Sequence, residues 1–211
     1  WTWAGGKEIA LHYERRNILG FGMDFAEDFT KSNWGFEFTW EKDVLLADND
    51  QFDGLSEVDR WNWTISVDRP TFINFLNQNR TFFINTQWFI QYVSGHEKAF
   101  ASNGPWNVLA VLAINTGYFD DRLLPGMSLV YDFGSNSGAW LPQITYRYSS
   151  NFSVTFGLAM FVGREEARPM AISPSSLSNR TGRHAYKDFV ENGLSAVRDR
   201  DEIFLKVRYT F

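Results

Sequence analysis

The sequence contains no cysteine, and this absence removes several classes of protein at once. A chain without thiols forms no disulfide scaffold, no cysteine metal site and no thiol-based active site. It also lacks any stretch of about 18 apolar residues, so it predicts no transmembrane helix. Basic tracts are missing too, because 20 Lys and Arg and 25 Asp and Glu residues are spread along the chain and give a net charge of −5. Nucleic acid is therefore not an expected partner.

Aromatic side chains, by contrast, are unusually abundant. The chain has 20 Phe, 9 Trp and 8 Tyr, or 18% of its 211 residues. So many rings require a large apolar surface to contact. Hydrophobic residues reach 44% and charged residues 21%, which is typical neither of a disordered chain nor of a bundle of membrane helices. The length suits one domain, residues 1–211.

The hydrophobic pattern repeats every second residue, which predicts strands with one apolar and one polar face. In the last segment, Ile203, Leu205, Val207 and Tyr209 alternate with mostly polar residues. Most such segments are close to the about 9–11 residues that a tilted strand needs to cross a bilayer. Ten segments show the pattern: 7–14, 18–26, 34–41, 60–68, 81–93, 106–119, 127–133, 139–148, 151–163 and 201–211. We predict an all-β protein, an antiparallel up-and-down transmembrane β-barrel with about ten visible strands.

Polar residues and chain breakers join these segments. Residues 69–80 hold Pro70 followed by several apolar residues, and predict a short helix at an interface. The longest connection, about 164–200, predicts one or two helical turns between Ala185 and Val190.

Alternation alone fits a soluble sandwich or ligand-binding barrel as well as a membrane barrel. Ten strands that each offer three to five large apolar groups would crowd a small soluble barrel, although two packed sheets can absorb them. Trp and Tyr cluster near segment ends, as Trp34, Trp40 and Tyr148 do, whereas segment centres are more often aliphatic or Phe. Aromatic girdles at both membrane interfaces have this distribution, so the pattern favours the membrane barrel.

The chain ends on Phe211, with Tyr209 and Val207 at the preceding alternate positions. This ending resembles the C-terminal strand signal by which bacterial outer-membrane proteins are recognised for insertion. The resemblance implies the bacterial outer membrane as location, and the lipid bilayer and the outer-membrane insertion machinery as partners. With a periplasmic C-terminus, the connections near 42–59, 94–105, 134–138 and 164–200 are expected outside, and those near 27–33, 69–80, 120–126 and 149–150 in the periplasm.

Two stretches carry a further resemblance. One runs from Asp68-Arg69-Pro70 through Leu76-Asn77 and continues with Thr81-Phe82-Phe83-Ile84 and Gln87-Trp88-Phe89, and the other is Arg198-Asp199-Arg200-Asp201-Glu202. They resemble a bacterial family of uncharacterised outer-membrane barrels, often encoded beside hydrophobic-solute exporters, over about a third of the chain. Members of that family are longer, so the resemblance implies a chain incomplete at its N-terminus and a barrel of more than ten strands. It implies no established substrate.

Candidate catalytic groups are few. The histidines are His12, His96 and His184, and no spacing between serine and histidine matches an outer-membrane hydrolase. Asp120-Asp121 resembles the acid pair of an outer-membrane aspartyl protease, but the pair lies in a predicted periplasmic turn, where aspartate favours turn formation. We therefore expect no enzyme.

Asp48, Asp50 and Asp53 bring oxygen ligands together in a predicted outer loop. Calcium prefers such ligands, but the spacing of an EF-hand and its distal glutamate are absent. We weigh a calcium site against a solvated acidic loop, and expect no cofactor.

Charged residues opposite the apolar face are candidates to line a solute path. Acids come mainly from the early strands and bases from the late strands, so a channel would have a transverse field that selects among solutes. The candidates are Glu37, Glu41, Asp68, Asp132, Arg147, Lys206 and Arg208, with Glu14 and Asp24 beside them. Phe83, Phe89, Phe161 and Phe204 share this face and suit an apolar solute or simple filling.

Two functions fit this pattern. The first is an outer-membrane channel or transporter for small organic solutes, hydrophobic ones among them. The second is a structural or assembly barrel, in which charges pair across a plugged lumen and the outer loops bind a partner. A lipid hydrolase is a distant third.

Overall fold

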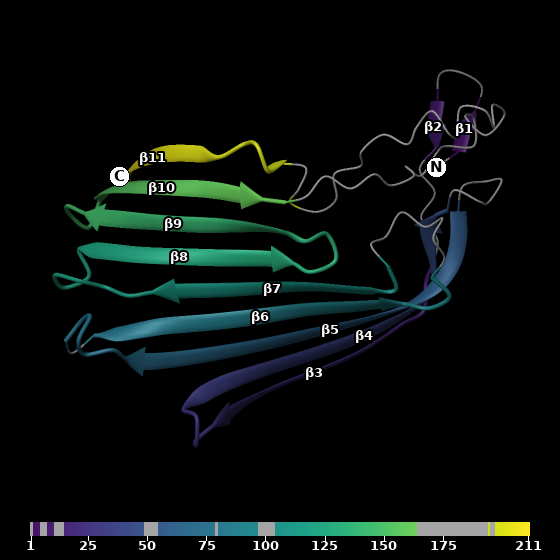
Figure 1. The fold of residues 1–211 in the computed structure, drawn as a ribbon, viewed down its shortest axis with the longest axis horizontal. Helices are drawn as coiled ribbons and strands as arrows, with labels where there is room; N and C mark the ends of the chain where they lie inside the picture. The colour runs from purple at the N-terminus through teal and green to yellow at the C-terminus, as the bar shows by residue number, and fades with distance from the viewer. Residues whose placement is uncertain are drawn as a thin grey trace.

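The described part of the computed structural model is a nine-stranded antiparallel sheet and a separate two-stranded one (Figure 1). The structure describes residues 2–4, 8–10, 15–48, 55–78, 80–96, 104–163, 194 and 197–211. The small sheet pairs β1 (Thr2–Ala4) with β2 (Glu8–Ala10). The large sheet contains β3 (Ile18–Glu27), β4 (Ser32–Ala47), β5 (Leu55–Phe72), β6 (Thr81–Val93), β7 (Trp106–Asn115), β8 (Leu123–Asp132), β9 (Ser137–Arg147), β10 (Phe152–Val162) and β11 (Glu202–Tyr209).

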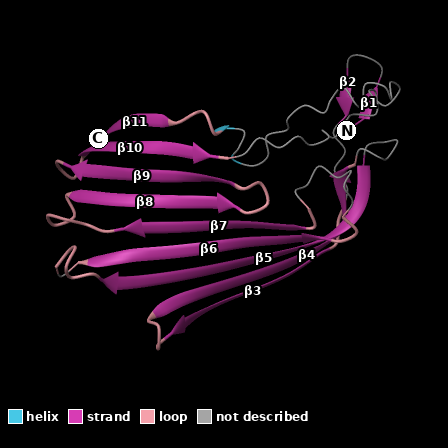
Figure 2. Cartoon of the chain, in the orientation of Figure 1, coloured by secondary structure: helices cyan, strands magenta, loops and turns pink. Residues whose placement is uncertain are grey.

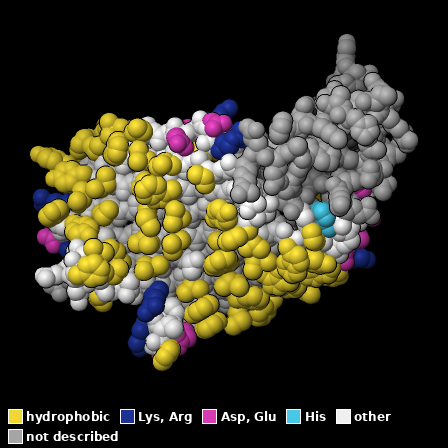
Figure 3. Space-filling view, in the orientation of Figure 1, with side chains coloured by type: hydrophobic (Ala, Val, Ile, Leu, Met, Phe, Trp, Pro, Cys, Tyr) yellow, Lys and Arg dark blue, Asp and Glu magenta, His cyan; other side chains and the backbone are white. Residues whose placement is uncertain are grey.

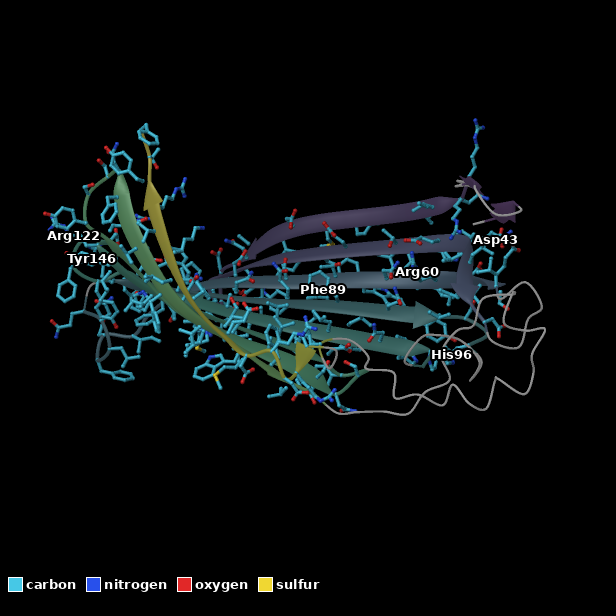
Figure 4. The ribbon with its side chains drawn as sticks, turned by 90° about the horizontal axis from the view of Figure 1, so that it is seen from above. Asp43, Arg60, Phe89, His96, Arg122 and Tyr146 are labelled. Atoms are coloured by element: carbon cyan, nitrogen blue, oxygen red, sulfur yellow. The ribbon has the colours of Figure 1, made fainter. Side chains whose placement is uncertain are left out.

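Each strand of the large sheet pairs with its neighbours in sequence, in the order β11-β10-β9-β8-β7-β6-β5-β4-β3. This order is an up-and-down meander, and the predicted all-β antiparallel class is confirmed. The described residues contain no α-helix, and the short helical segment drawn before β11 in Figure 2 is 3₁₀, at Leu194 and Val197. The sheet is strongly twisted but not closed, since β3 and β11 form its two edges (Figure 4).

The predicted short helix over residues 69–80 is wrong. β5 continues through Pro70 to Phe72, and a tight turn follows in which the N–H groups of Leu76 and Asn77 both donate to the Ile73 carbonyl, at 2.9 and 3.0 Å. A proline usually interrupts a central strand because it has no N–H. Pro70 avoids this cost because the β4 pairing stops at Asp68, so the end of β5 pairs with β6 alone.

The outer loop predicted near 42–59 is also mostly strand. β4 extends to Ala47 and β5 begins at Leu55. A bulge between Glu41 and Val44 shifts the register by one residue, so that Val44 pairs with Val58. Val44, Val58 and Val93 then form a small core with exposures of 4%, 8% and 2%. Burial of these three side chains explains why the hairpin continues.

Other expectations fall partly or wholly outside the described residues. In the predicted segment 7–14, only the short β2 is described as a strand. The predicted segment 127–133 is described in full, but its strand, β8, begins four residues earlier, at Leu123. The predicted helical turns between Ala185 and Val190 lie outside the described residues. No helix in the described ranges is long and apolar enough to cross a membrane.

Strand alternation divides the sheet into two faces of opposite character. Side chains of directly paired residues lie on the same face. One row across six strands is Met23, Phe36, Ile65, Trp88, Ala110 and Tyr131, and it belongs to what we call the apolar face. The neighbouring row is Gly22, Glu37, Thr64, Phe89, Leu109, Asp132 and Ser137, on what we call the polar face. Figure 3 shows hydrophobic side chains spread across the sheet, with charged groups gathered at the rims.

The two ends of the sheet also differ. The connections 28–31, 73–80, 116–122 and 148–151 and the C-terminus lie at one end, which we call the turn end (Figure 1). The other end, which we call the loop end, carries the connections 48–54, 94–105, 133–136 and 163–201. Arg122 and Tyr146 mark the turn end in Figure 4, and Asp43 and His96 mark the loop end.

Candidate functional site

The polar face collects the charged residues predicted to line a solute path. Cross-strand pairing places seven predicted residues and Asp24 together on this face, whereas Glu14 lies outside the described side chains. The seven are Glu37, Glu41, Asp68, Asp132, Arg147, Lys206 and Arg208. The face therefore has an acidic side on β3–β5 and a basic side on β9–β11.

Arg60 partly neutralises the acidic side. It is the direct partner of Glu41 across β4 and β5, and its Nε donates to Glu41 Oε2 at 3.1 Å while Nη2 contacts the same oxygen. Asn62 adds a longer contact to Glu41 Oε1, at 3.4 Å. The sequence prediction missed Arg60 because its pairing with Glu41 depends on the strand register, and alternation alone does not define the register. Glu41 is thus a paired acid, whereas Glu37 is exposed with no ion pair among the described residues.

Amide side chains connect the acidic side to the neutral middle of the face. Gln91 Nε2 donates to Asn62 Oδ1 at 3.0 Å, and Asn62 Nδ2 donates to Thr39 Oγ1 at 3.2 Å. Asn85 Nδ2 donates to Asp68 Oδ1 at 2.6 Å. Each donor and acceptor pair joins directly opposed residues, so the network follows the sheet register. A face built this way offers both donors and acceptors to a passing solute.

The basic side is different because its charges form no ion pair with any described residue. Arg147, Lys206 and Arg208 are all exposed, and none forms an ion pair within the described ranges. Glu202 shares this face but lies at the other end of β11. No ion pair joins the acidic side to the basic side among the residues that the structure describes.

Asp132 has a structural task at the loop end. It is 6% exposed, and its carboxylate accepts hydrogen bonds from the Gly134 N–H at 2.9 Å and from the Ser135 hydroxyl at 2.6 Å. These contacts hold the turn between β8 and β9. Asp132 therefore shares the polar face without offering a free carboxylate to it.

Phenylalanines interrupt the polar face, as the sequence predicts. Phe83 and Phe89 lie on β6, and Phe89 is visible along the face in Figure 4. Phe204 is directly opposite Gly157, and its ring covers the space where a Cβ of residue 157 would lie, with Cζ at 2.2 Å. Glycine at that position is what allows the ring to lie flat on the sheet.

The turn end of the polar face is hollowed. A cavity of about 610 Å³ spans β6 to β9 and is lined by Phe83, Asn115, Leu124, Gln143, Thr145 and Arg147, among others. A second cavity of about 330 Å³ adjoins Arg147 and Arg208. The two cavities share Arg147, so the hollows are continuous with the basic side.

The acids considered for other chemistry lie in turns or loops or outside the described residues. Asp120 and Asp121 stand in the turn between β7 and β8, where Arg80 pairs with them at 2.7 and 3.4 Å. Asp48 is 1% exposed and accepts a hydrogen bond from the Ser56 hydroxyl at 2.5 Å. Asp50, Asp53, His12 and His184 lie outside the described residues. No group of three metal-ligating side chains occurs in the described part of the chain.

The C-terminal residues form one edge of the sheet. Val207 pairs with Val154 and Tyr209 with Phe152. The rings of Tyr209 and Phe211 meet edge to face, with centroids 5.1 Å apart. The terminal residues therefore present an apolar edge on the last strand.

Comparison with known proteins identifies the family of the chain. No curated protein and no solved structure matches the chain. A family model described as "Protein of unknown function (DUF1302)" matches residues 4–211. That match covers the whole nine-stranded sheet, and the chain belongs to the DUF1302 family.

Proposed function

We propose that this chain forms a β-barrel of the bacterial outer membrane whose polar face lines a path for small organic solutes. The observation that carries the proposal is the unbroken, exposed apolar face of the nine-stranded sheet (Figure 3). Phe21 and Leu205 on the two edge strands and Trp140 on β9 have exposures of 57%, 69% and 42%. A soluble monomer rarely exposes a continuous apolar surface of this kind.

Energetics favour lipid as the cover for this face. Full burial of a large apolar side chain gains about 1.5–3 kcal/mol, whereas a basic side chain on the lipid face near the membrane centre costs about 2–4 kcal/mol. The apolar-face row that runs from Met23 to Tyr131 contains no charged residue, and Arg69 joins this face only near the turn end, opposite Ile84. Strand lengths of 8 to 18 residues reach or exceed what crossing requires, except in β11.

Aromatic rings lie where a bilayer would have its interfaces. Trp40, Trp61, Tyr92 and Trp106 are consecutive cross-strand partners near the loop end. The rings of Tyr92 and Trp106 have centroids 4.7 Å apart. Near the turn end lie Trp34, Tyr146, Tyr148 and Tyr209. A group of such rings at each end supports a membrane with one interface at each end.

The last strand supports an insertion route. Ile203, Leu205, Val207 and Tyr209 project from the apolar face of an edge strand and are 59–75% exposed, and Phe211 follows them. The outer-membrane insertion machinery is the proposed partner for this edge. The turn end would then face the periplasm and the loop end the exterior.

The solute path is proposed from the polar face. Its amides, one-sided charges and cavities suit small organic solutes with polar groups, and its phenylalanines suit their apolar parts. The second candidate, a plugged barrel that binds a partner through its loops, is favoured by Phe204 lying flat on the sheet and by the buried Val44, Val58 and Val93.

Conductance separates the two candidates. The full chain would be folded in detergent, checked for heat-dependent gel mobility, and added to planar lipid bilayers. Stepwise conductance that changes its ion selectivity in Glu37→Gln and Arg147→Gln variants supports the path. A folded, inserted and silent protein supports the plugged barrel. A chain that stays monomeric in buffer without detergent contradicts the membrane proposal itself.

A further inference from the structure

Two arginines flank one serine at the turn end of the polar face. Ser153 on β10 is the direct partner of Arg147 on β9 and of Arg208 on β11. Neighbouring strands are about 4.8 Å apart, so the two arginine backbones stand about 10 Å apart across the serine. Both side chains are exposed, and this separation lets them converge on one group above Ser153.

The next row extends the same chemistry. Thr145, Thr155 and Lys206 are consecutive partners across these strands, and the two threonine hydroxyls lie 2.8 Å apart. Three cations and several hydroxyls therefore share a small area. Like charges at such spacing are unfavourable unless a counter-charge joins them.

No described carboxylate supplies that counter-charge. None of the described residues that line the smaller cavity, Arg147, Ser153 and Arg208 among them, is acidic. Among the described residues that line the larger cavity, Asp121 is the one acid, and it already pairs with Arg80. The described surroundings leave an anion as the missing partner.

The larger cavity indicates which anion fits. It begins at Arg147 and continues past Phe83, Leu124 and Pro125. Phe83 is 59% exposed although it lies on the polar face, so an apolar surface stands beside the cationic one. Asn115 and Gln143 add amides along the same wall.

We propose that this site binds a small organic acid, with its carboxylate between Arg147 and Arg208 and its apolar body beside Phe83 and Leu124. Arginine suits this role because its planar fork binds a carboxylate through two parallel hydrogen bonds. The proposal rests on the proposed function only in naming the solute class. Binding itself requires neither conduction nor a closed barrel.

Calorimetric titration of the full chain in detergent tests the site with four probes: benzoate, benzylamine, acetate and inorganic phosphate. We expect saturable benzoate binding, no benzylamine binding, and acetate and phosphate each at least about tenfold weaker than benzoate. Benzylamine binding as tightly as benzoate would overturn the charge assignment. Binding of phosphate or acetate as tightly as benzoate would overturn the proposed apolar contact with Phe83 and Leu124.

Variants locate the site independently. Arg147→Gln and Arg208→Gln should each weaken benzoate binding about tenfold or more, whereas Arg147→Lys should retain part of it. The matched control is Arg69→Gln, which removes the same charge at the turn end of β5 from an exposed residue on the apolar face and outside both cavities. Equal loss in the control, or no loss in either site variant, contradicts the proposal.

The outcomes separate this proposal from the channel. If the protein binds benzoate but shows no conductance, the binding site is supported and the solute path is contradicted. Conductance that is indifferent to benzoate, in a protein that does not bind it, keeps the path and ends the site. Heat-dependent gel mobility of each variant establishes that a lost affinity is not a lost fold.

Discussion

At the scale of single residues, the contact between Phe204 and Gly157 shows how a glycine shapes the polar face. An added Cβ at residue 157 would lie 2.2 Å from Phe204 Cζ, so the ring must swing off the sheet. Gly20 shares the polar face, and a Cβ there would meet nothing closer than 3.6 Å. A side chain at residue 157 would therefore collide with its neighbour whereas one at residue 20 would fit, although both glycines occupy polar-face positions in the sequence pattern.

We predict that Gly157→Ala lowers the free energy of unfolding by about 1–3 kcal/mol through overpacking. Gly20→Ala, the matched control, should stay within about 0.5 kcal/mol of the parent chain. The penalty at Gly157 should largely vanish in a Phe204→Ala background, which removes the ring. Urea unfolding in detergent, followed by tryptophan fluorescence, measures the parent chain, the two glycine variants, Phe204→Ala and the Gly157→Ala/Phe204→Ala double variant. A penalty that survives the loss of Phe204 would show that the ring is not its cause.

Arg60 and Asp132 show what the sequence cannot provide at this scale. Alternation correctly places Glu41 and Asp132 on the polar face. It does not reveal that Arg60 pairs with Glu41, or that the 133–136 turn occupies the carboxylate of Asp132. Such contacts depend on strand register and turn geometry, which hydrophobic period leaves open.

At the scale of elements, two neighbouring turns are joined at the turn end. Asn77, after β5, is 9% exposed and its Nδ2 donates to the Gly117 carbonyl at 2.8 Å. The Tyr118 hydroxyl donates back to the Leu76 carbonyl at 3.2 Å. Arg80 pairs with Asp120 and Asp121, whose φ angles of 53° and 61° lie in the left-handed region.

The buried amide should matter more than the exposed ion pairs. Asn77→Ala removes hydrogen bonds to a partly buried carbonyl, which should cost about 1–3 kcal/mol. Arg80→Gln removes pairs in which Asp120 is 98% exposed, and such pairs contribute about 0–1 kcal/mol. Unfolding by urea, with hydrogen exchange at 116–122 as a local readout, ranks the two variants. The reverse ranking would mean that the ion pairs hold the turns together.

The sequence predicts which segments form strands far better than it predicts where each strand begins and ends. All nine large-sheet strands coincide with predicted segments, because one apolar and one polar face impose a period of two. The ends differ where a tertiary contact extends a strand, as Val44 and Val58 do for β4 and β5. The helix expected after Arg69 fails for a related reason, since β6 pairs with β5 as far as Phe72.

At the scale of the whole molecule, the two open edges set a rule for closing the proposed barrel. Nine strands alternate in direction, so β3 and β11 run the same way. A direct seam between them would be parallel, whereas membrane barrels are usually antiparallel throughout. Pairing of one edge with the same edge of a second copy would place the two copies upside down relative to each other in the membrane. Antiparallel closure therefore needs an odd number of further strands between β3 and β11.

Disulfide trapping tests this rule, and the absence of native cysteine makes every introduced thiol unambiguous. Val154 and Val207 are direct partners on β10 and β11, so Val154→Cys with Val207→Cys is the positive control and should cross-link readily. Phe21→Cys on β3, combined in turn with Leu205→Cys, Val207→Cys or Tyr209→Cys, should not cross-link, because further strands would hold the two edges beyond the about 4.4–6.8 Å that a disulfide spans between Cα atoms. Efficient cross-linking of any β3–β11 pair in folded, membrane-inserted protein would instead establish a parallel seam and a barrel closed by nine strands. The solute path would then be narrow enough for Phe83, Phe89, Phe161 and Phe204 to fill, and the plugged barrel would become the better description.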